Sequence, residues 1–124
     1  MAVPILKQGP FLIATIQAAL TDTDVLQLQD DVMAQVTRHR SRGIIVDVTA
    51  LDVMDSFVSR SLQGIARMTR LRGATTVIVG IQPEVAFAMV QLGMKFEDVK
   101  TALDLEEGLA LLQYQLKEPL DGGG

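Results

Sequence analysis

Two short apolar runs with a turn between them open the chain. The runs cover residues 4–7 and 11–16, and Gln8-Gly9-Pro10 separates them. Apolar runs of this length are typical of strands, and glycine followed by proline is typical of a turn. The pattern predicts a β-hairpin at the start of the fold.

Apolar residues then recur at helical spacing. The polar residues 21–24 offer N-cap side chains for a helix over about residues 24–40, and we expect Gly43 to end it. Spacing of three and four residues predicts one buried stripe on this helix, formed by Val25, Leu28, Val32 and Val36.

A second helix with two faces is predicted over residues 57–71. We expect its apolar arc to be buried: Phe57, Val58, Leu62, Ile65, Met68 and Leu71. The opposite, polar arc consists of Ser59, Arg60, Gln63, Arg67 and Arg70. Two further helices are predicted, one over residues 83–93 and one that starts near Asp104 and ends before Pro119.

Three short segments between these helices are predicted to be strands. Residues 44–48 and 75–79 are apolar or β-branched almost throughout, which is typical of strands covered on both faces, and a shorter strand is expected near residues 99–101. The order β-β-α-β-α-β-α-β-α implies an α/β fold. We expect a mixed, mostly parallel sheet that is opened by a β-hairpin and covered by about four helices.

The composition narrows the class of protein. A chain of 124 residues has room for one domain, which we place at residues 1–118, with a disordered tail at residues 119–124. No apolar run approaches the roughly 18 residues of a membrane span, a signal peptide is not evident and cysteine is absent, so we expect a cytoplasmic protein. The net charge of −4 and the aromatic content of 4% argue against a nucleic-acid binder.

Ser56 follows Asp55 where the loop after residues 44–48 meets the second predicted helix. A serine at such a place can be an ordinary N-cap, whose loss costs about 1 kcal/mol. It can equally be an exposed phosphoacceptor, because the N–H groups of a helix start favour a phosphate. Ser59 and Ser61 would compete, but both lie inside the helix. The residues alone leave both roles open, and accessibility favours Ser56 as the phosphorylation site.

No set of residues predicts catalysis. The Gly-x-Ser-x-Gly elbow and the glycine-rich nucleotide-binding motifs are absent, and the one histidine, His39, lies among arginines at a predicted helix end. Asp47, Asp52 and Asp55 could approach one another, but the more ordinary interpretation is that Asp47 and Asp52 accept hydrogen bonds from loop amides. We expect no enzyme activity, cofactor or metal, and keep a small ligand-binding domain built on these three residues as an alternative.

The arginines of the second helix have two interpretations. Arg60, Arg67 and Arg70 form either a solvated face or a contact strip that runs from Ser56 toward a partner protein. The acidic residues at positions 21–24 would flank this strip. We predict the partner-binding residues to be Asp55, Ser59, Arg60, Gln63, Arg67, Asp22 and Asp24.

Residues 47–57 resemble the signature of STAS domains, the family of anti-sigma-factor antagonists. The general motif is Asp-Ser-Ser-Gly-Leu, and this chain has Phe57 and Val58 in place of the second serine and the glycine. That departure, together with residues 80–83 and 101–109, is similar to the RsbS branch, the single-domain STAS proteins of the bacterial stressosome. The resemblance covers essentially the whole chain.

By this resemblance, the helices would pack mainly on one face of a STAS sheet, and Ser56 matches the family's phosphoacceptor. The protein would be a non-enzymatic scaffold that holds an RsbT-type serine kinase and releases it once Ser56 is phosphorylated, in a bacterial stress response. A phosphatase would reset the switch. RsbR-type sensors would join it in a large complex, and a homodimer through STAS domains is expected. The alternative is a conventional antagonist that acts as a free monomer or dimer.

Overall fold

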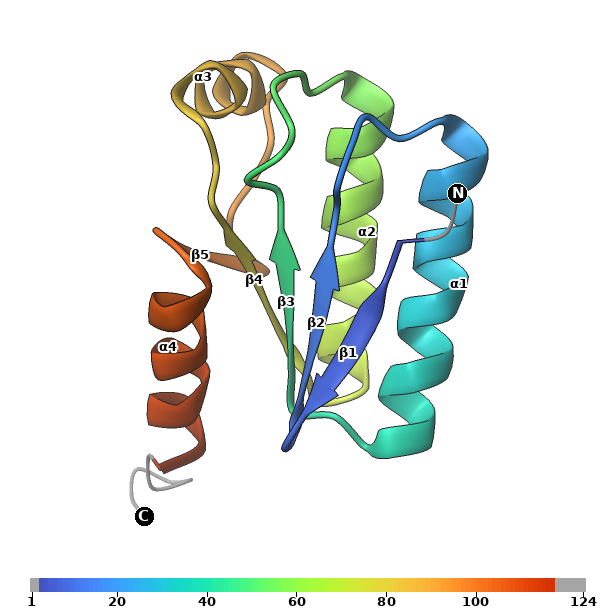
Figure 1. Ribbon diagram of the computed structural model, residues 1–124, viewed down its shortest axis with the longest axis vertical. Helices are drawn as coiled ribbons and strands as arrows, with labels where there is room; N and C mark the ends of the chain where they lie inside the picture. Colours follow the sequence, from blue (N-terminus) through green and yellow to red (C-terminus); the bar gives the residue numbers. More distant parts are fainter. Residues whose placement is uncertain (1–2, 118–124) are drawn as a thin grey trace.

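The computed structural model describes residues 3–117, which form one sheet with helices on both faces (Figure 1). The elements are β1 (Ile5–Gln8), β2 (Phe11–Thr15), α1 (Asp22–His39), β3 (Gly43–Asp47), α2 (Ser56–Leu71), β4 (Thr75–Val79), α3 (Pro83–Gln91), β5 (Val99–Ala102) and α4 (Leu105–Lys117). Their order is the predicted one. The tail expected at residues 119–124 lies outside the described residues. Within residues 3–117, no helix is long and apolar enough to cross a bilayer.

The sheet has the order β1-β2-β3-β4-β5. β1 pairs with β2 in an antiparallel manner, so that Ile5 lies opposite Ala14, and the other three pairings are parallel. These pairings confirm the predicted hairpin and the mixed, mostly parallel sheet. Because β2, β3 and β4 run in one direction, the loops that follow them meet at a single edge of the sheet, which we call the strand-end edge.

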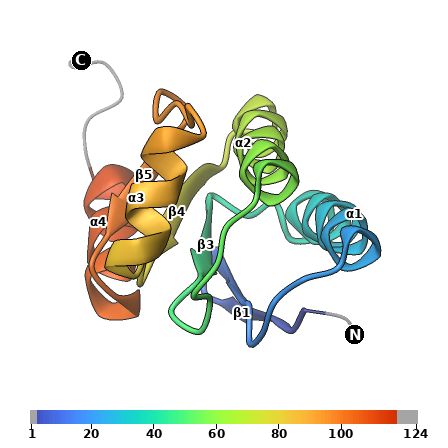
Figure 2. The ribbon, with the colours of Figure 1, turned by 90° about the horizontal axis from the view of Figure 1, so that it is seen from above.

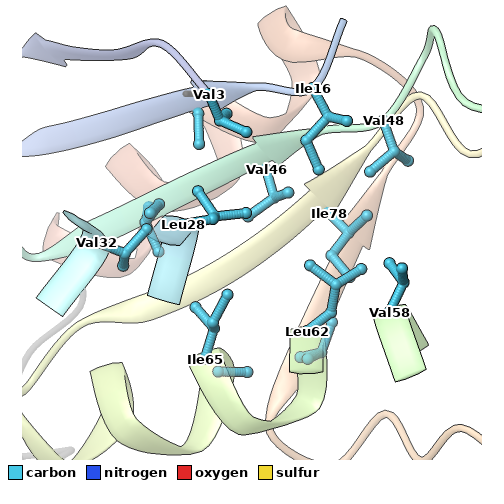
Figure 3. Packing of buried hydrophobic residues seen from close by; sticks show 14 of the residues in the cluster. Val3, Ile16, Leu28, Val32, Val46, Val48, Val58, Leu62, Ile65 and Ile78 are labelled. Carbon is cyan, nitrogen blue, oxygen red and sulfur yellow. The ribbon is translucent and has the colours of Figure 1, made fainter. Parts of the chain in front are cut away.

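The molecule has two separate hydrophobic cores, one on each face of the sheet. Alternate residues of the strands belong to different cores, because successive side chains of a strand point to opposite faces. The larger core lies beneath α1 and α2 and also receives Val85 and Met89 of α3. In Figure 3, Leu28 and Val32 of α1 lie over the sheet near Val46. The smaller core lies beneath α4, on the other face (Figure 2). The helices therefore pack mainly on one face, as expected, and α4 is the exception.

The helix α1 confirms the predicted stripe, since Val25, Leu28, Val32 and Val36 are all buried. The predicted end near residue 40 is confirmed, whereas the expectation that Gly43 ends the helix is wrong. The helix closes at Arg40, which adopts the left-handed conformation with φ of 50°, and Gly43 is already the first residue of β3. Gly43 is needed for a different reason: a Cβ there would lie 2.8 Å from the Leu112 side chain of α4. The glycine permits close helix packing and does not stop a helix.

The predicted buried arc of α2 is correct for Val58, Leu62 and Ile65 and wrong for Leu71, which is 87% exposed. Leu71 follows Arg67 by four residues, which is about one helical turn, and therefore shares the exposed face of that arginine. Its apolar character alone suggested burial, but the helical geometry places it among the polar residues.

Gly108 sets the distance between α4 and the sheet. A Cβ at this position would lie 2.8 Å from Val79 Cγ1 and 3.3 Å from Ile45 Cδ1. We expect Gly108→Val to lower the free energy of unfolding by about 1–3 kcal/mol, although valine is the better helix former. Urea denaturation measures this, with the exposed Ala110→Val on the same helix as the control. An equal loss in both variants would contradict the close packing.

Candidate phosphorylation site and partner surface

The loop between β3 and α2 is held in place from within. Asp47, the last residue of β3, accepts hydrogen bonds from the Thr49 N–H (3.0 Å) and the Thr49 hydroxyl (2.6 Å). Leu51 and Met54 insert into the larger core and are 3% and 7% exposed. The prediction that Asp47 accepts a loop amide is confirmed. The polar and apolar anchors together fix the backbone that leads to Asp55.

A neighbouring loop braces the same segment. The Gln82 side-chain amide donates to the Thr49 carbonyl at 2.6 Å, and Gly80, with φ of 75°, lies so close to the Thr49 side chain that a Cβ would collide with it. Thr49, Gly80 and Gln82 were not among the predicted site residues. The sequence feature that points to these residues is the segment Gly80-Ile81-Gln82-Pro83, which follows an apolar strand. This segment is also one of those that resemble the STAS family.

Asp55, and not Ser56, is the N-cap of α2. Its carboxylate accepts the Val58 N–H at 2.8 Å, and its backbone is extended, as a cap requires. Ser56 is the first residue of the helix, and its side chain is exposed. Of the two roles that the sequence left open for Ser56, the structure removes the capping role. Ser56 is exposed to solvent, and its hydroxyl does not cap the helix.

The competing serines of α2 are not accessible. Ser59 and Ser61 are 3% and 8% exposed. The predicted role of Ser59 as a partner-binding residue is therefore wrong. Ser59 lies three residues before Leu62 and seven before Ala66, so the helix carries it to the packed side of α2. A kinase would have to unwind the helix to reach either serine.

The polar strip of α2 consists of Arg60, Gln63, Arg67 and Arg70. Arg60 forms no ion pair within residues 3–117, whereas the other three are fastened to a neighbouring segment. Arg60, one turn after Ser56, is exposed. Further along, Gln63 donates to the Lys95 carbonyl at 3.2 Å, and Asp98 pairs with Arg67 at 3.5 Å and with Arg70 at 2.8 Å. The ion pairs are partly exposed, so each contributes little to stability. They nevertheless tie α2 to the segment before β5, a contact that the sequence did not indicate.

The acidic residues in the first turn of α1, Asp22 and Asp24, lie at the same edge as Ser56, because α1 and α2 start at the same end of the molecule (Figure 1). Asp24 and Thr21 form a capping box, with both backbone-to-side-chain bonds at 3.1 Å. Asp22 is exposed beside them. A depression of about 170 Å³ separates the two helix starts and is lined by Ala19, Leu20, Leu51, Val53, Asp55 and Val58. Asp22 and Asp24 thus lie in the first turn of α1, at the same edge of the sheet at which Asp55 and Ser56 start α2.

The carboxylates of the β3–α2 loop do not converge. The carboxylate of Asp47 accepts hydrogen bonds from Thr49, and Asp52 and Asp55 are exposed. In the part of the chain that the structure describes, no three His, Cys, Asp or Glu side chains are grouped so that they could hold a metal ion. Within the described residues, this edge therefore combines an exposed hydroxyl, an apolar depression and separate charges.

The capping assignment can be tested by stability measurements. Asp55→Ala removes the acceptor of the Val58 N–H and is expected to lower the free energy of unfolding by about 0.5–2 kcal/mol. Ser56→Ala is expected to stay within about 0.5 kcal/mol of the wild type, because its side chain is exposed. Asp55→Asn, which keeps a cap acceptor, serves as the control. If Ser56→Ala were as destabilising as Asp55→Ala, the cap would be misassigned.

Comparison with known proteins identifies the family to which the chain belongs. A STAS domain model matches residues 2–108. The chain is 30% identical to the RsbT co-antagonist protein RsbRA of Bacillus subtilis over 83 residues, which are 67% of this chain and 30% of that protein. It is 30% identical to RsbRD of the same organism over 89 residues, or 72% and 32%. The chain spans less than a third of the length of these relatives.

Solved structures of other proteins match this chain over nearly its full length. RsbS from Moorella thermoacetica, in a serine-to-glutamate variant, is 33% identical with a TM-score of 0.83, covering 93% of this chain and 97% of that one. A chain from the molecular architecture of the stressosome is 32% identical with a TM-score of 0.78, covering 92% and 99%. The antagonist SpoIIAA, 15% identical with a TM-score of 0.69, shares the fold. The chain belongs to the STAS domain family.

Proposed function

We propose that this chain is a non-enzymatic stressosome scaffold that holds an RsbT-type serine kinase and releases it when Ser56 is phosphorylated. The observation that carries the proposal is the exposed Ser56 hydroxyl at the first position of α2, with the capping task taken by Asp55. The similarity to RsbS over 93% of the chain supports it. Residues 1–118 would form a single STAS domain in the cytoplasm.

The proposed modification is a phosphoryl transfer from ATP. The Ser56 oxygen attacks the γ-phosphorus of ATP, a new P–O bond forms, and the bond from that phosphorus to the bridging oxygen of ADP breaks. A base of the kinase takes the hydroxyl proton. A phosphatase reverses the change by hydrolysis, which returns the hydroxyl and inorganic phosphate. This chain supplies only the acceptor, and its exposed position at a helix start lets it enter the kinase without local unfolding.

Phosphorylation would act through charge at the surface. It adds about −1.5 to −2 charges beside Asp55, and like charges at an interface cost on the order of several kcal/mol. A loss of about 3 kcal/mol would weaken binding of the kinase roughly a hundredfold. The fold itself would persist, because negative charge at a helix N-terminus is favourable by about 0.3–1 kcal/mol.

The kinase would dock on the strand-end edge and along α2. The depression between the helix starts offers an apolar floor, including Leu20 and Val58, with the carboxylate of Asp55 at its rim. Exposed acidic groups there suit a partner surface that carries lysine or arginine. We propose these contact residues: Asp22, Asp24, Asp55, Arg60, Gln63 and Arg67. The fastened residues Gln63 and Arg67 would present a rigid surface.

The switch is tested by phosphorylation and binding measurements. With an RsbT-type kinase and ATP, intact mass should show one phosphate on the wild type and none on Ser56→Ala. Ser56→Ala should hold the kinase as the unphosphorylated wild type does, whereas Ser56→Asp should bind about tenfold more weakly, since its single charge imitates phosphate only in part. Gln113→Asp on α4 controls for added charge. Equal affinity of both Ser56 variants for the kinase would refute the switch.

The scaffold role is tested by assembly. We propose that RsbR-type STAS sensors combine with this chain in a large complex and that the isolated chain forms a homodimer through its STAS domain. In sedimentation velocity, a mixture with an RsbR-type protein should contain a species much heavier than either component. If the chain sedimented as a monomer or dimer in that mixture, it would act as a conventional free antagonist.

A further inference from the structure

The three arginines on the exposed strip of α2 are not equivalent. Arg67 and Arg70 both pair with Asp98, at 3.5 and 2.8 Å. Arg60 makes no ion pair within residues 3–117, although it is exposed on the same strip. The guanidinium of Arg60 is therefore available to pair with an anion that is added to the protein by modification.

The helix itself gives Arg60 no acidic neighbour. Side chains three and four residues apart meet on a helix surface, with about 5–6 Å between their Cβ atoms. For Arg60 these positions are Ser56, Phe57, Gln63 and Gly64, and none of them carries a charge. Phosphorylation of Ser56 would place a dianion four residues before Arg60. That order, with the acid N-terminal to the base, is the favourable one.

Side-chain direction supports the contact. Long side chains on a helix lean back toward its N-terminus, over the preceding turn. In this orientation an arginine at position 60 reaches toward position 56, and its guanidinium can bind two phosphate oxygens at once. By contrast, Arg67 lies eleven residues after Ser56 and is already engaged by Asp98. Only one arginine of the strip is placed to respond to the modification.

We propose that Arg60 binds the phosphate of phosphorylated Ser56 within the same helix, and so leaves the partner surface. This inference rests on the proposed phosphorylation of Ser56 and adds the residue that responds to it. Phosphorylation would then change two charges at the interface. An anion appears at Ser56, and the cation of Arg60 is no longer offered to the kinase.

Carboxylates in the same region would also act on a phosphate at Ser56. Asp52 and Asp55 of the β3–α2 loop precede Ser56 and are exposed, and Asp22 is exposed in the first turn of α1. These carboxylates disfavour the dianionic phosphate and are unchanged when Arg60 is replaced. A difference between the wild type and an Arg60 variant therefore reports on Arg60 alone.

The experiment is a phosphorus-31 NMR titration of protein in which phosphoserine is incorporated at position 56 during synthesis, so that no kinase is required. The phosphate of the wild type is expected to bind its last proton about twofold more weakly than that of Arg60→Gln, as follows from the strength of an exposed helix ion pair. Arg60→Lys should restore part of the difference. Arg67→Gln is the matched control and should titrate like the wild type.

The difference between wild type and Arg60→Gln should shrink at 1 M salt, where screening acts within about 3 Å. Identical titrations of the wild type and Arg60→Gln at low salt would overturn the inference, as would an equal change in Arg67→Gln. Circular dichroism of each variant confirms that α2 is intact.

The outcome is separable from the proposed function. If the kinase left Ser56 unmodified, the proposed function would fail, and the phosphoserine protein would still decide whether Arg60 pairs with a phosphate. If the kinase modified Ser56 and Arg60→Gln titrated like the wild type, the switch would stand and only the role of Arg60 would be lost.

Discussion

The parallel pairing of β2, β3 and β4 is the constraint on which the rest of this structure depends. Parallel strands need a crossover between them and cover on both faces, which is why helices lie on each side of the sheet. The same pairing sends every strand-to-helix loop to one edge. Ser56, Asp55 and the capping box of α1 therefore lie at one edge of the sheet although residues 25–54 separate them along the chain.

Packing within this frame explains why the strand-end edge is well defined. Leu51 and Met54 hold the loop before α2 in the larger core, while Thr49 joins it to the neighbouring loop through Gln82. A loop that is anchored at several points presents its exposed residues in one geometry. Binding to such a surface requires little ordering of the partner-facing backbone, which favours affinity.

The sequence predicted what depends on local periodicity. The buried stripe of α1, the hairpin and the order of strands and helices follow from spacing within a few residues. The sequence left Ser56 open as the cap and did not single out Asp55, and because both residue types cap helices well, only the structure assigns the cap to Asp55. The pairing of Asp98 with Arg67 and Arg70 joins residues 28 or more positions apart, so no local pattern reveals it. The polar character of Ser59 predicts exposure, but its angle on α2 turns it toward the packed side of the helix.

Asp55 caps the helix, and Ser56 is the proposed phosphoacceptor. Because these two roles belong to different residues, mutations at Ser56 can be interpreted more simply in genetic experiments. A residue that both caps a helix and receives a signal would link every change in signalling to a change in protein abundance, since a loss of 1–2 kcal/mol alters cellular levels several-fold. Here the cap is fixed by Asp55. Alleles that alter Ser56 should leave the amount of protein nearly constant, so their phenotypes in a cell would report on the proposed phosphorylation switch and not on stability.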